Sequence, residues 1–427
     1  MRIKMPYSDI PPLEVPDQNL MGYYYPKREP DAEPPREAVS RALANPIGAV
    51  RLAEAVRPGQ KVLLLVDDIT RPTPQHQLLP PVIEELHRGG IRDEDLRVLI
   101  AYGSHRAMAP VEKRLKLGST VITRHEVLDH DWESKTDLAD LGKLEDGTPV
   151  VVNRHLVESD FVLSVGHIVP HRAQGFTGGG KMVLPGVSGR ASLNAMHWKE
   201  AQYTTGEILG RADNPVRQTS DEFARRAGLK YVVNVVLDDE DRVVGAWAGD
   251  PVRAHREGCR KSLDVYGIAI PEPADICVID SYPADIDLWQ ANKAIFAADA
   301  AVKQGGVLIL VTPAPEGAAR THPRLAKIGF RPHQEIARMV EEGQIEAGAS
   351  AAALSDVGRV IKEKATGIMV SPGIKPAVQK QLGFQPAKTP QEALKMAFDR
   401  KGRDAKVVVF HHGGEIVPLP QRNGTRD

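Results

Sequence analysis

Cysteine is scarce in this 427-residue chain: only Cys259 and Cys277 are present, too few for a disulfide framework or a cysteine-rich metal centre. Any metal must therefore be held by histidine, by carboxylates or by a cofactor. Long hydrophobic runs are missing as well. No segment approaches the roughly 20 apolar residues of a membrane-spanning helix, and the N-terminus has no apolar core of signal-peptide length. We therefore expect a cytoplasmic protein without a membrane partner.

The chain also lacks an excess of charge of either sign, because its 55 Lys and Arg residues nearly cancel its 56 Asp and Glu residues. No basic stripe with interleaved aromatic residues is present, which argues against nucleic acid as a partner. We expect a small-molecule partner instead. The length and the 42% hydrophobic content are typical of a globular protein of two or three domains.

Predicted strands and helices alternate along the chain, which indicates an α/β fold of two domains with mostly parallel sheets. The clearest strands are apolar runs, at 62–66, 96–101, 161–165, 276–279, 307–311 and 406–410. The proline-rich arm at 8–38 is expected to have little regular structure, and 267–273 is expected to be a linker. We predict one domain over 1–268, rejoined by 404–427, a second over 274–403, and a ligand cleft between them.

Polar turns follow two neighbouring predicted strands. The first, Asp67-Asp68-Ile69-Thr70-Arg71-Pro72-Thr73-Pro74, places Asp68, Thr70 and Arg71 at the start of a helix, where an anion would fit. A capped turn with a solvated Asp–Arg pair is the structural alternative. His105 lies in the second turn, 103–106. A lone histidine is usually structural, but the carboxyl ends of adjacent parallel strands face one crevice, which favours function for both turns.

The densest run of glycine and polar residues spans 166–181. His167 and His171 have the i, i+4 spacing of a zinc-peptidase helix, but Pro170 lies between them and no Glu follows His167. We therefore expect the two histidines to line a loop, where one could act as a general acid or base. The role of His167 stays open.

The segment 175–181 has phosphate-loop spacing up to Lys181, but Met182 occupies the place of the magnesium-binding Ser or Thr, which disfavours a nucleotide triphosphatase. Gly178 and Gly179 would let the backbone approach a ligand closely, and Lys181 could serve as a cation or as an amine nucleophile. A glycine-rich turn with a solvated lysine is the alternative. His197 follows on a predicted helix, where a single histidine is by default a core or surface residue.

Gln290 and Lys293 lie one helical turn apart, next to Trp289. On one helix face they would offer an amide and an ammonium group to a small carboxylate. A solvated helix face explains the pair equally well.

Taken in order, these segments resemble the nickel-pincer nucleotide-dependent lactate racemase family and its 2-hydroxyacid racemase and epimerase relatives. The resemblance covers most of the chain. Its most specific part is the Gly-His-x-x-Pro-His to Gly-Gly-x-Lys run, which is followed sixteen residues later by His197.

The resemblance implies a pyridinium-3,5-bisthiocarboxylic acid mononucleotide that holds nickel and is attached covalently to Lys181. It implies that His197 is the protein's nickel ligand and that His105 and His171 are the acid/base pair. The positions expected to contact the cofactor are Asp68, Thr70, Arg71, Gly178 and Gly179, and those expected to bind the substrate are Trp289, Gln290 and Lys293. The N-terminal domain would then hold the cofactor and the C-terminal domain would clamp the substrate.

The expected reaction is inversion at C2 of a 2-hydroxyacid by reversible hydride transfer, with cofactor-biosynthesis proteins as further partners. The substrate stays open among lactate, a longer hydroxyacid and a sugar acid, because no Trp occurs after Trp289, whereas lactate-using members place one near the substrate. Two alternatives remain: a nucleotide-binding enzyme that uses 175–181, and a non-catalytic carrier of the nickel cofactor.

Overall fold

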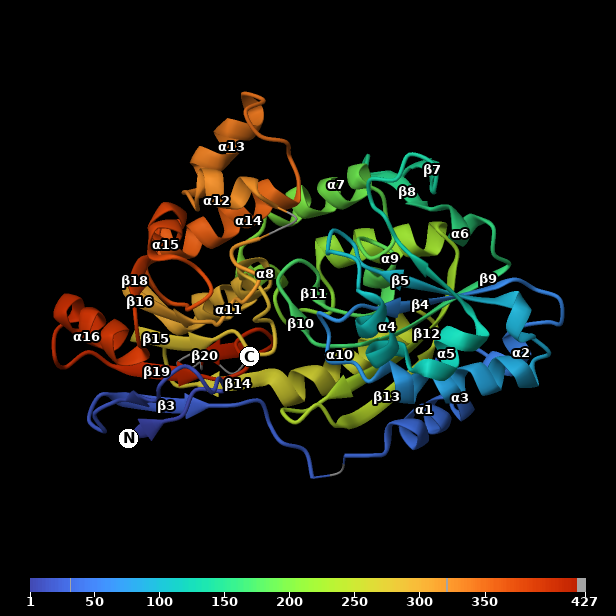
Figure 1. Ribbon diagram of the computed structural model, residues 1–427, viewed down its shortest axis with the longest axis horizontal. Coiled ribbons are helices and arrows are strands. Elements are labelled where there is room, and N and C mark those ends of the chain that lie inside the picture. Colours follow the sequence, from blue (N-terminus) through green and yellow to red (C-terminus); the bar gives the residue numbers. More distant parts are fainter. Residues whose placement is uncertain (31, 320–321, 421–427) are drawn as a thin grey trace, which may run out of the picture. The chain divides into compact units, whose positions relative to one another are not determined.

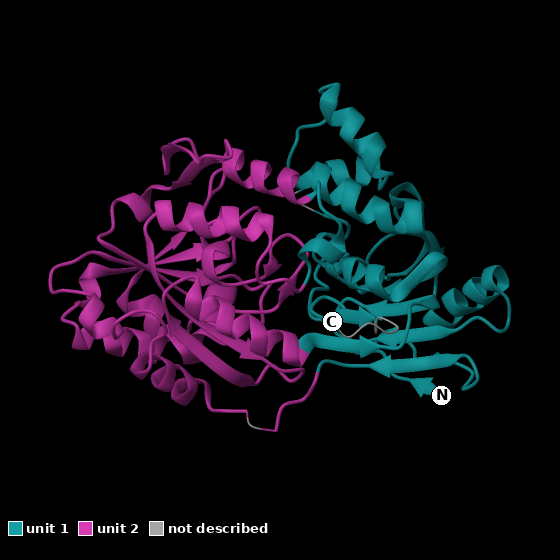
Figure 2. Ribbon diagram, turned by 180° about the vertical axis from the view of Figure 1, so that it is seen from behind, with its two compact units in different colours: residues 1–26, 201–209, 266–427 teal, residues 27–200, 210–265 magenta. Residues whose placement is uncertain are grey.

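The computed structural model describes residues 1–30, 32–319 and 322–420. The chain forms two compact units, coloured separately in Figure 2: unit 1 comprises Met1–Pro26, Ala201–Leu209 and Tyr266–Asp427, and unit 2 comprises Lys27–Glu200 and Gly210–Val265. Each unit is built on a six-stranded, mostly parallel sheet with helices, so the predicted α/β class is confirmed. Figure 1 labels the elements.

The sheet of unit 2 has the strand order β13-β12-β9-β4-β5-β6. All neighbouring pairs are parallel except β12 with β13. The strands are β4 (Val62–Asp67), β5 (Leu96–Ala101), β6 (Glu126–Asp129), β9 (Phe161–His167), β12 (Leu229–Leu237) and β13 (Val243–Gly249). The chain runs outward from β4 through β5 to β6 and then returns to the other side of β4 as β9. The topological switch point, where ligands bind in open α/β sheets, therefore lies between β4 and β9.

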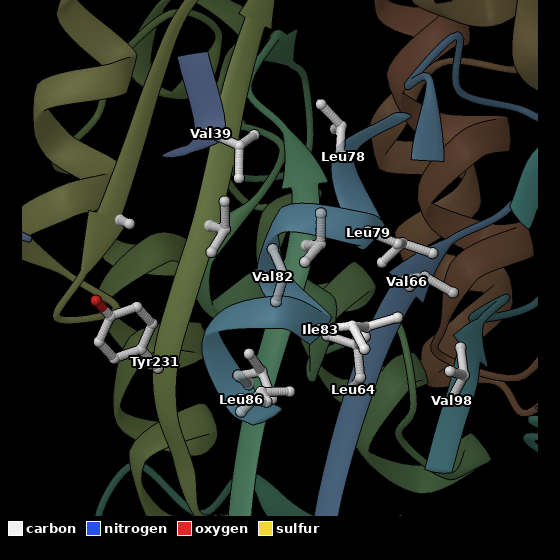
Figure 3. Close-up of a cluster of buried hydrophobic side chains, with 14 of the residues drawn as sticks. Val39, Leu64, Val66, Leu78, Leu79, Val82, Ile83, Leu86, Val98 and Tyr231 are labelled. Carbon is white, nitrogen blue, oxygen red and sulfur yellow. The ribbon is translucent and has the colours of Figure 1, made fainter. Parts of the chain in front are cut away.

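Burial explains this sheet, because β4 and β9 are apolar or uncharged along nearly their whole length and are covered on both faces, as parallel strands are. On one face Leu64 and Val66 of β4 pack against α3 (Gln75–Arg88) with Leu79 and Val82 (Figure 3). The remaining helical and hairpin elements of unit 2 are α1 (Pro35–Ala44), α2 (Leu52–Ala55), η1 (Asp93–Asp95), α4 (Pro110–Leu117), α5 (Ser119–Arg124), β7 (Leu138–Lys143), β8 (Pro149–Asn153), α6 (Arg154–Val157), β10 (Pro170–His171), β11 (Gly175–Phe176), η2 (Gly179–Met182), α7 (Arg190–Glu200), α9 (Pro215–Arg226) and α10 (Arg253–Tyr266), whose last residue belongs to unit 1.

The sheet of unit 1 has the order β18-β17-β16-β15-β19-β3 and is parallel throughout. Its strands are β3 (Leu20–Tyr24), β15 (Ala274–Asp280), β16 (Val302–Val311), β17 (Ala365–Val370), β18 (Gln385–Ala387) and β19 (Val407–Phe410). The switch point is between β15 and β19, by the same argument as for unit 2. The other elements are β1 (Arg2–Ile3), β2 (Leu13–Glu14), α8 (Thr205–Ile208), β14 (Gly267–Ile270), α11 (Leu288–Ala301), α12 (Arg324–Ile328), α13 (His333–Glu341), α14 (Ala349–Gly358), η3 (Arg359–Lys364), α15 (Pro376–Leu382), α16 (Pro390–Lys401) and β20 (Val417–Pro420).

The predicted boundaries differ from these units in three places. The last predicted strand does not return to the N-terminal domain: β19 pairs with β15 and β3 inside unit 1. Its four residues are all buried, and a position between β15 and β3 in a parallel sheet covers both faces of the strand. The prediction of 404–427 as a return to the first domain is therefore wrong for the described part, and 421–427 lie outside the described residues. Residues 1–26 and 201–209 also belong to unit 1.

Two local predictions were also wrong. The expected linker contains β14, which pairs in parallel with β20, because Ile268 and Ile270 alternate with less buried residues and need a partner on one face. The proline-rich arm includes β2, β3 and the start of α1, since no proline lies within either strand and Pro35 begins the helix.

Among the described residues, no helix is long and apolar enough to span a membrane.

Candidate active site

Asp68 and His105 form the centre of a polar network at the carboxyl edge of the unit 2 sheet. Asp68 follows β4 and His105 follows β5, and the His105 Nδ1 donates to Asp68 Oδ2 across 2.7 Å. Thr70 donates both its backbone N–H and its hydroxyl to Asp68 Oδ1, and Arg71 Nη1 donates to Thr70 Oγ1 at 2.9 Å. The structure thus brings together four residues that two separate motifs predicted.

The Asp68 carboxylate is held in its charged form. Burial by itself raises the pKa of Asp68, but His105 and Arg71 outweigh it and hold this pKa well below its usual range. A carboxylate accepts but cannot donate, so His105 carries its proton on Nδ1 and its Nε2 is left as a proton acceptor. The His105 side chain is 22% exposed, whereas Asp68 is 3% exposed.

His167 ends β9, directly across the switch point from β4, and is not a loop residue as predicted. Its Nδ1 lies 2.9 Å from Thr73 Oγ1, and Thr73 donates to Asp67 Oδ2. Lys116 Nζ lies 3.0 Å from Asp67 Oδ1. Burial raises the pKa of Asp67, but Lys116 and His167 overcome this and lower it to about 2. These buried groups connect the ends of β4 and β9 and so position the turns that follow.

His171 lies on the short strand β10, which pairs with β11 in a tight hairpin. The Ala173 backbone N–H donates to His171 Nδ1 at 3.1 Å. Neutral His171 therefore carries its proton on Nε2, the opposite tautomer to His105. The two predicted acid/base histidines thus differ in the atom that holds the proton.

The glycine-rich segment 175–181 is supported by buried polar side chains from other elements. Arg217 of α9 is fully buried and donates to the carbonyls of residues 174, 176 and 178. Asn234 of β12 accepts from the Gly179 N–H at 3.1 Å. Gly178 and Gly179 have positive φ angles, and a Cβ on Gly178 would lie 2.2 Å from the Asn234 Oδ1. The loop conformation therefore requires glycine.

Lys181 lies in η2, a four-residue 3-10 turn, and does not open a long helix as a phosphate-loop lysine does. Burial lowers the pKa of Lys181 to about 7, and the positive charges of Arg71 and Arg217 act in the same direction against Asp68 and Glu200. The lowered pKa raises the neutral fraction of the amine at neutral pH, which suits a nucleophile.

His197 lies on α7, and its Nδ1 is 3.5 Å from the Glu200 carboxylate one turn further along the helix. No group of three or more His, Cys, Asp or Glu side chains that could hold a metal occurs within the described parts of the chain. The His197 imidazole can contribute one ligand to a metal.

The predicted substrate residues lie in unit 1, at the start of α11 after β15. Asp287 caps this helix by accepting from the Gln290 N–H at 2.9 Å, and Lys293 Nζ donates to Gln290 Oε1 at 2.6 Å. The two side chains thus meet on one helix face, as the spacing predicted. The Trp289 ring stacks on His322 with centroids 3.7 Å apart and an angle of 8° between the planes.

Sequence reasoning missed the residues that support the site. None of these residues carries a motif: Arg217, Asn234 and Lys116 come from elements distant in sequence, and Glu200 ends the helix that contains His197. The one signal available for them was a polar or charged residue in a segment otherwise expected to pack, which is too common to single them out.

Comparison with known proteins places these features in a family. Residues 8–206 match the lactate racemase N-terminal domain, and residues 270–417 match the lactate racemase C-terminal domain. The lactate racemase of Thermoanaerobacterium thermosaccharolyticum is 28% identical over 387 residues, covering 89% of this chain and 90% of the relative. That of Lactiplantibacillus plantarum is 29% identical over 389 residues, covering 90% of each chain.

Solved structures agree with these sequence matches. The lactate racemase apoprotein from T. thermosaccharolyticum has a TM-score of 0.87 at 27% identity and covers 98% of this chain and 100% of that one. A Thermotoga maritima protein shares the fold, with a TM-score of 0.74 at 21% identity. Since the two domain matches together account for most of the chain, the protein belongs to the lactate racemase family and is an isomerase of the racemase type.

Proposed function

We propose that this racemase inverts C2 of a 2-hydroxyacid with the help of a nickel-pincer nucleotide attached covalently to Lys181. The observation that carries the proposal is the position of Lys181 at the end of a glycine-rich loop whose carbonyls are held by the buried Arg217. Burial and the charges of Arg71 and Arg217 also lower the pKa of the Lys181 amine to about 7. An ordinary solvated lysine is almost entirely protonated at pH 7 and would be a poor nucleophile.

The residues present fit such a group. Gly178 and Gly179 shape the loop that carries Lys181, because a Cβ on either would meet Asn234 or His255. The Arg71 guanidinium can bind a phosphate group of the nucleotide. His197 would supply the protein's ligand to nickel, and the remaining ligands would come from the thio-acid arms. When bound, the cofactor supplies an electron sink for the hydride of the substrate α-carbon, which common side chains cannot provide.

His105 and His171 would move the hydroxyl proton. Two groups are needed because the hydroxyl lies on different sides in the two enantiomers. His105 presents a basic Nε2 because Asp68 holds its Nδ1–H, and Asp68 also stabilises the imidazolium that forms when the proton is taken. His171 presents an Nε2–H because its Nδ1 accepts from Ala173, so in this state it is a donor.

Gln290 and Lys293 would hold the substrate carboxylate. Their contact at 2.6 Å places an amide and an ammonium group side by side, and a carboxylate can accept from both. Trp289 would limit the space beside the α-carbon, so it is the position at which we expect lactate to be distinguished from a longer hydroxyacid or a sugar acid.

The first experiment is intact-protein mass spectrometry and nickel analysis of the chain co-expressed with the proteins that make the cofactor. We expect an adduct mapped to Lys181, about one nickel per chain, and racemisation of at least one 2-hydroxyacid in a screen. Lys181→Ala should carry no adduct, and Lys303→Ala, which removes a lysine paired with Asp275 in unit 1, serves as the control for non-specific attachment. An unmodified, nickel-free wild-type chain despite a supply of cofactor would refute the proposal.

Two alternative functions make different predictions. A nucleotide triphosphatase would lose hydrolysis on Lys181→Ala and be indifferent to His197→Ala; the short η2 turn disfavours it. A carrier of the nickel cofactor would bind nickel but be indifferent to changes at His105 and His171; the Asp68–His105 pair disfavours it, because a store needs no oriented base.

A further inference from the structure

Glu200 is a buried carboxylate that no assigned role explains. It is the last residue of α7 and is 6% exposed. Within the part of the chain that the structure describes, its Oε2 has no hydrogen-bond partner. Burying a carboxylate oxygen without a donor is unfavourable by roughly 1–3 kcal/mol or more.

The position of Glu200 at the end of α7 does not stabilise its buried carboxylate. The last turn of a helix favours cations, because the free carbonyls there carry partial negative charge. The backbone carbonyl of Glu200, and not its carboxylate, accepts from Arg172 Nη2 at 3.5 Å. The carboxylate thus lies at the end of a helix with one oxygen buried and without a donor, which is typical of a functional group.

His197 is the ring that this carboxylate faces. The Glu200 Oε1 lies 3.5 Å from His197 Nδ1, and the two side chains are 7% and 16% exposed. Their i, i+3 spacing on one helix places both on the same face. A carboxylate near Nδ1 favours the tautomer with the proton there and leaves the Nε2 lone pair directed away.

We propose that Glu200 is the positioning residue for His197: it holds the Nδ1–H, directs Nε2 toward the metal and makes the imidazole a stronger donor. This inference rests on the proposed function for the identity of the metal. Histidine ligands of metals generally donate their other ring N–H to such a partner, and loss of the partner lowers metal affinity about 10–100-fold.

The test compares Glu200→Ala, Glu200→Gln and Lys199→Ala in chains co-expressed with the cofactor-producing proteins. Lys199→Ala is the matched control, because it removes a charged side chain from the same turn of α7. The Lys199 ammonium donates to Asp146 and does not act on His197. Nickel and the Lys181 adduct are measured separately after timed exposure to a chelator. We expect Glu200→Ala to keep the adduct but to lose nickel about 10–100-fold more readily than wild type.

Glu200→Gln should fall between the two, because its amide oxygen still accepts from Nδ1–H but carries no charge. Lys199→Ala should retain nickel like wild type. Equal nickel retention in Glu200→Ala and wild type, with the adduct present in both, would overturn the inference. So would equal nickel loss in Lys199→Ala, which would assign the effect to the stability of α7.

A second readout needs no cofactor and separates this inference from the proposed function. ¹⁵N NMR of histidine-labelled protein, with the His197 signal assigned through His197→Gln, reports which ring nitrogen is protonated. We expect the Nδ1–H tautomer in wild type and a shift toward Nε2–H in Glu200→Ala. An Nε2–H tautomer in wild type would refute the role of Glu200, whereas an absent Lys181 adduct would refute only the cofactor proposal.

Discussion

Each unit places an aspartate and a histidine together at the carboxyl ends of adjacent parallel strands, yet the two pairs differ in what surrounds them. In unit 2, Asp68 follows β4 and holds His105, whose side chain is 22% exposed. In unit 1, Asp280 ends β15 and pairs with His411, which follows β19 and whose side chain is 3% exposed.

Aromatic residues account for the difference. The Tyr25 ring stacks on His411 at 4.5 Å, and the Tyr23 ring meets it edge-on at 5.0 Å. The His411 Nε2 is buried and has no hydrogen-bond partner among the described residues. In the proposed function the Asp68–His105 pair supplies a base to the substrate, whereas the Asp280–His411 pair joins the ends of β15 and β19 among aromatic rings.

The largest expected effect separates the two pairs by activity. His105→Ala should lower kcat by about 10²–10⁴-fold, because a positioned acid/base group contributes that much. His411→Ala should leave kcat per folded molecule within about twofold of wild type. Racemisation assays on cofactor-loaded proteins check both. A large loss of kcat in a fully folded His411→Ala chain would contradict the comparison.

The next effect separates the pairs by stability. His411→Ala leaves the Asp280 carboxylate buried without its partner and should lower the free energy of unfolding by about 3 kcal/mol or more. The control is His87→Ala, which breaks a partly exposed pair with Asp93, at side-chain exposures of 33% and 30%, and should lower the free energy of unfolding by less than about 1 kcal/mol. Chemical unfolding followed by circular dichroism measures the difference. Equal losses in the two variants would show that burial of the pair is not what matters.

A third prediction separates binding from chemistry. Lys293→Ala should reduce kcat/KM by about 10–100-fold, mainly by raising KM, because it removes one charge-assisted hydrogen bond to the carboxylate. Lys303→Ala, which breaks a surface ion pair with Asp275 in the same unit, should leave KM unchanged. Steady-state kinetics in both directions test this. An effect on kcat alone would show that Lys293 acts in the chemical step and not in substrate binding.

The smallest expected effect concerns pH. The pKa of Asp68 is depressed in the folded chain relative to about 3.9 in the unfolded chain, so its stabilisation is fully present above about pH 4. It is lost as pH falls through the folded value. Asp68→Asn should therefore have a free energy of unfolding lower than that of wild type by roughly 1–2 kcal/mol near pH 7, and this difference should become smaller below about pH 4. A difference in the free energy of unfolding that grows in acid would mean that another group sets the stability there.

Much of the fold was predictable because its strands are apolar runs. The span of β5 was predicted without error, and β4 and β9 differ from prediction by two residues or fewer at each end. Strand partners were less predictable. The sequence of β19 predicts a buried strand but does not say in which unit. Its pairing with β15 in the folded chain places it in unit 1.

The site divides in the same way. His105, Lys181 and Gln290 lie in short motifs that mark them as candidate site residues, and the family resemblance supplied their expected roles. Glu200 and Arg217 do not, because a glutamate at a helix end or an arginine within a helix is ordinary until its burial and neighbours are known.

The sequence by itself determined the α/β class, the family and the residues that could carry the chemistry, since these depend on local hydrophobic pattern and on motifs. Tertiary structure alone decided which residues meet. It brought Asp68 into hydrogen-bond contact with His105 and placed Arg217 against the carbonyls of the glycine-rich loop. It also lowered the pKa of Lys181 and stacked Tyr25 on His411. Burial and charge act through space. Groups far apart along the chain therefore change the pKa values and side-chain orientations of one another, and no local sequence pattern contains this information.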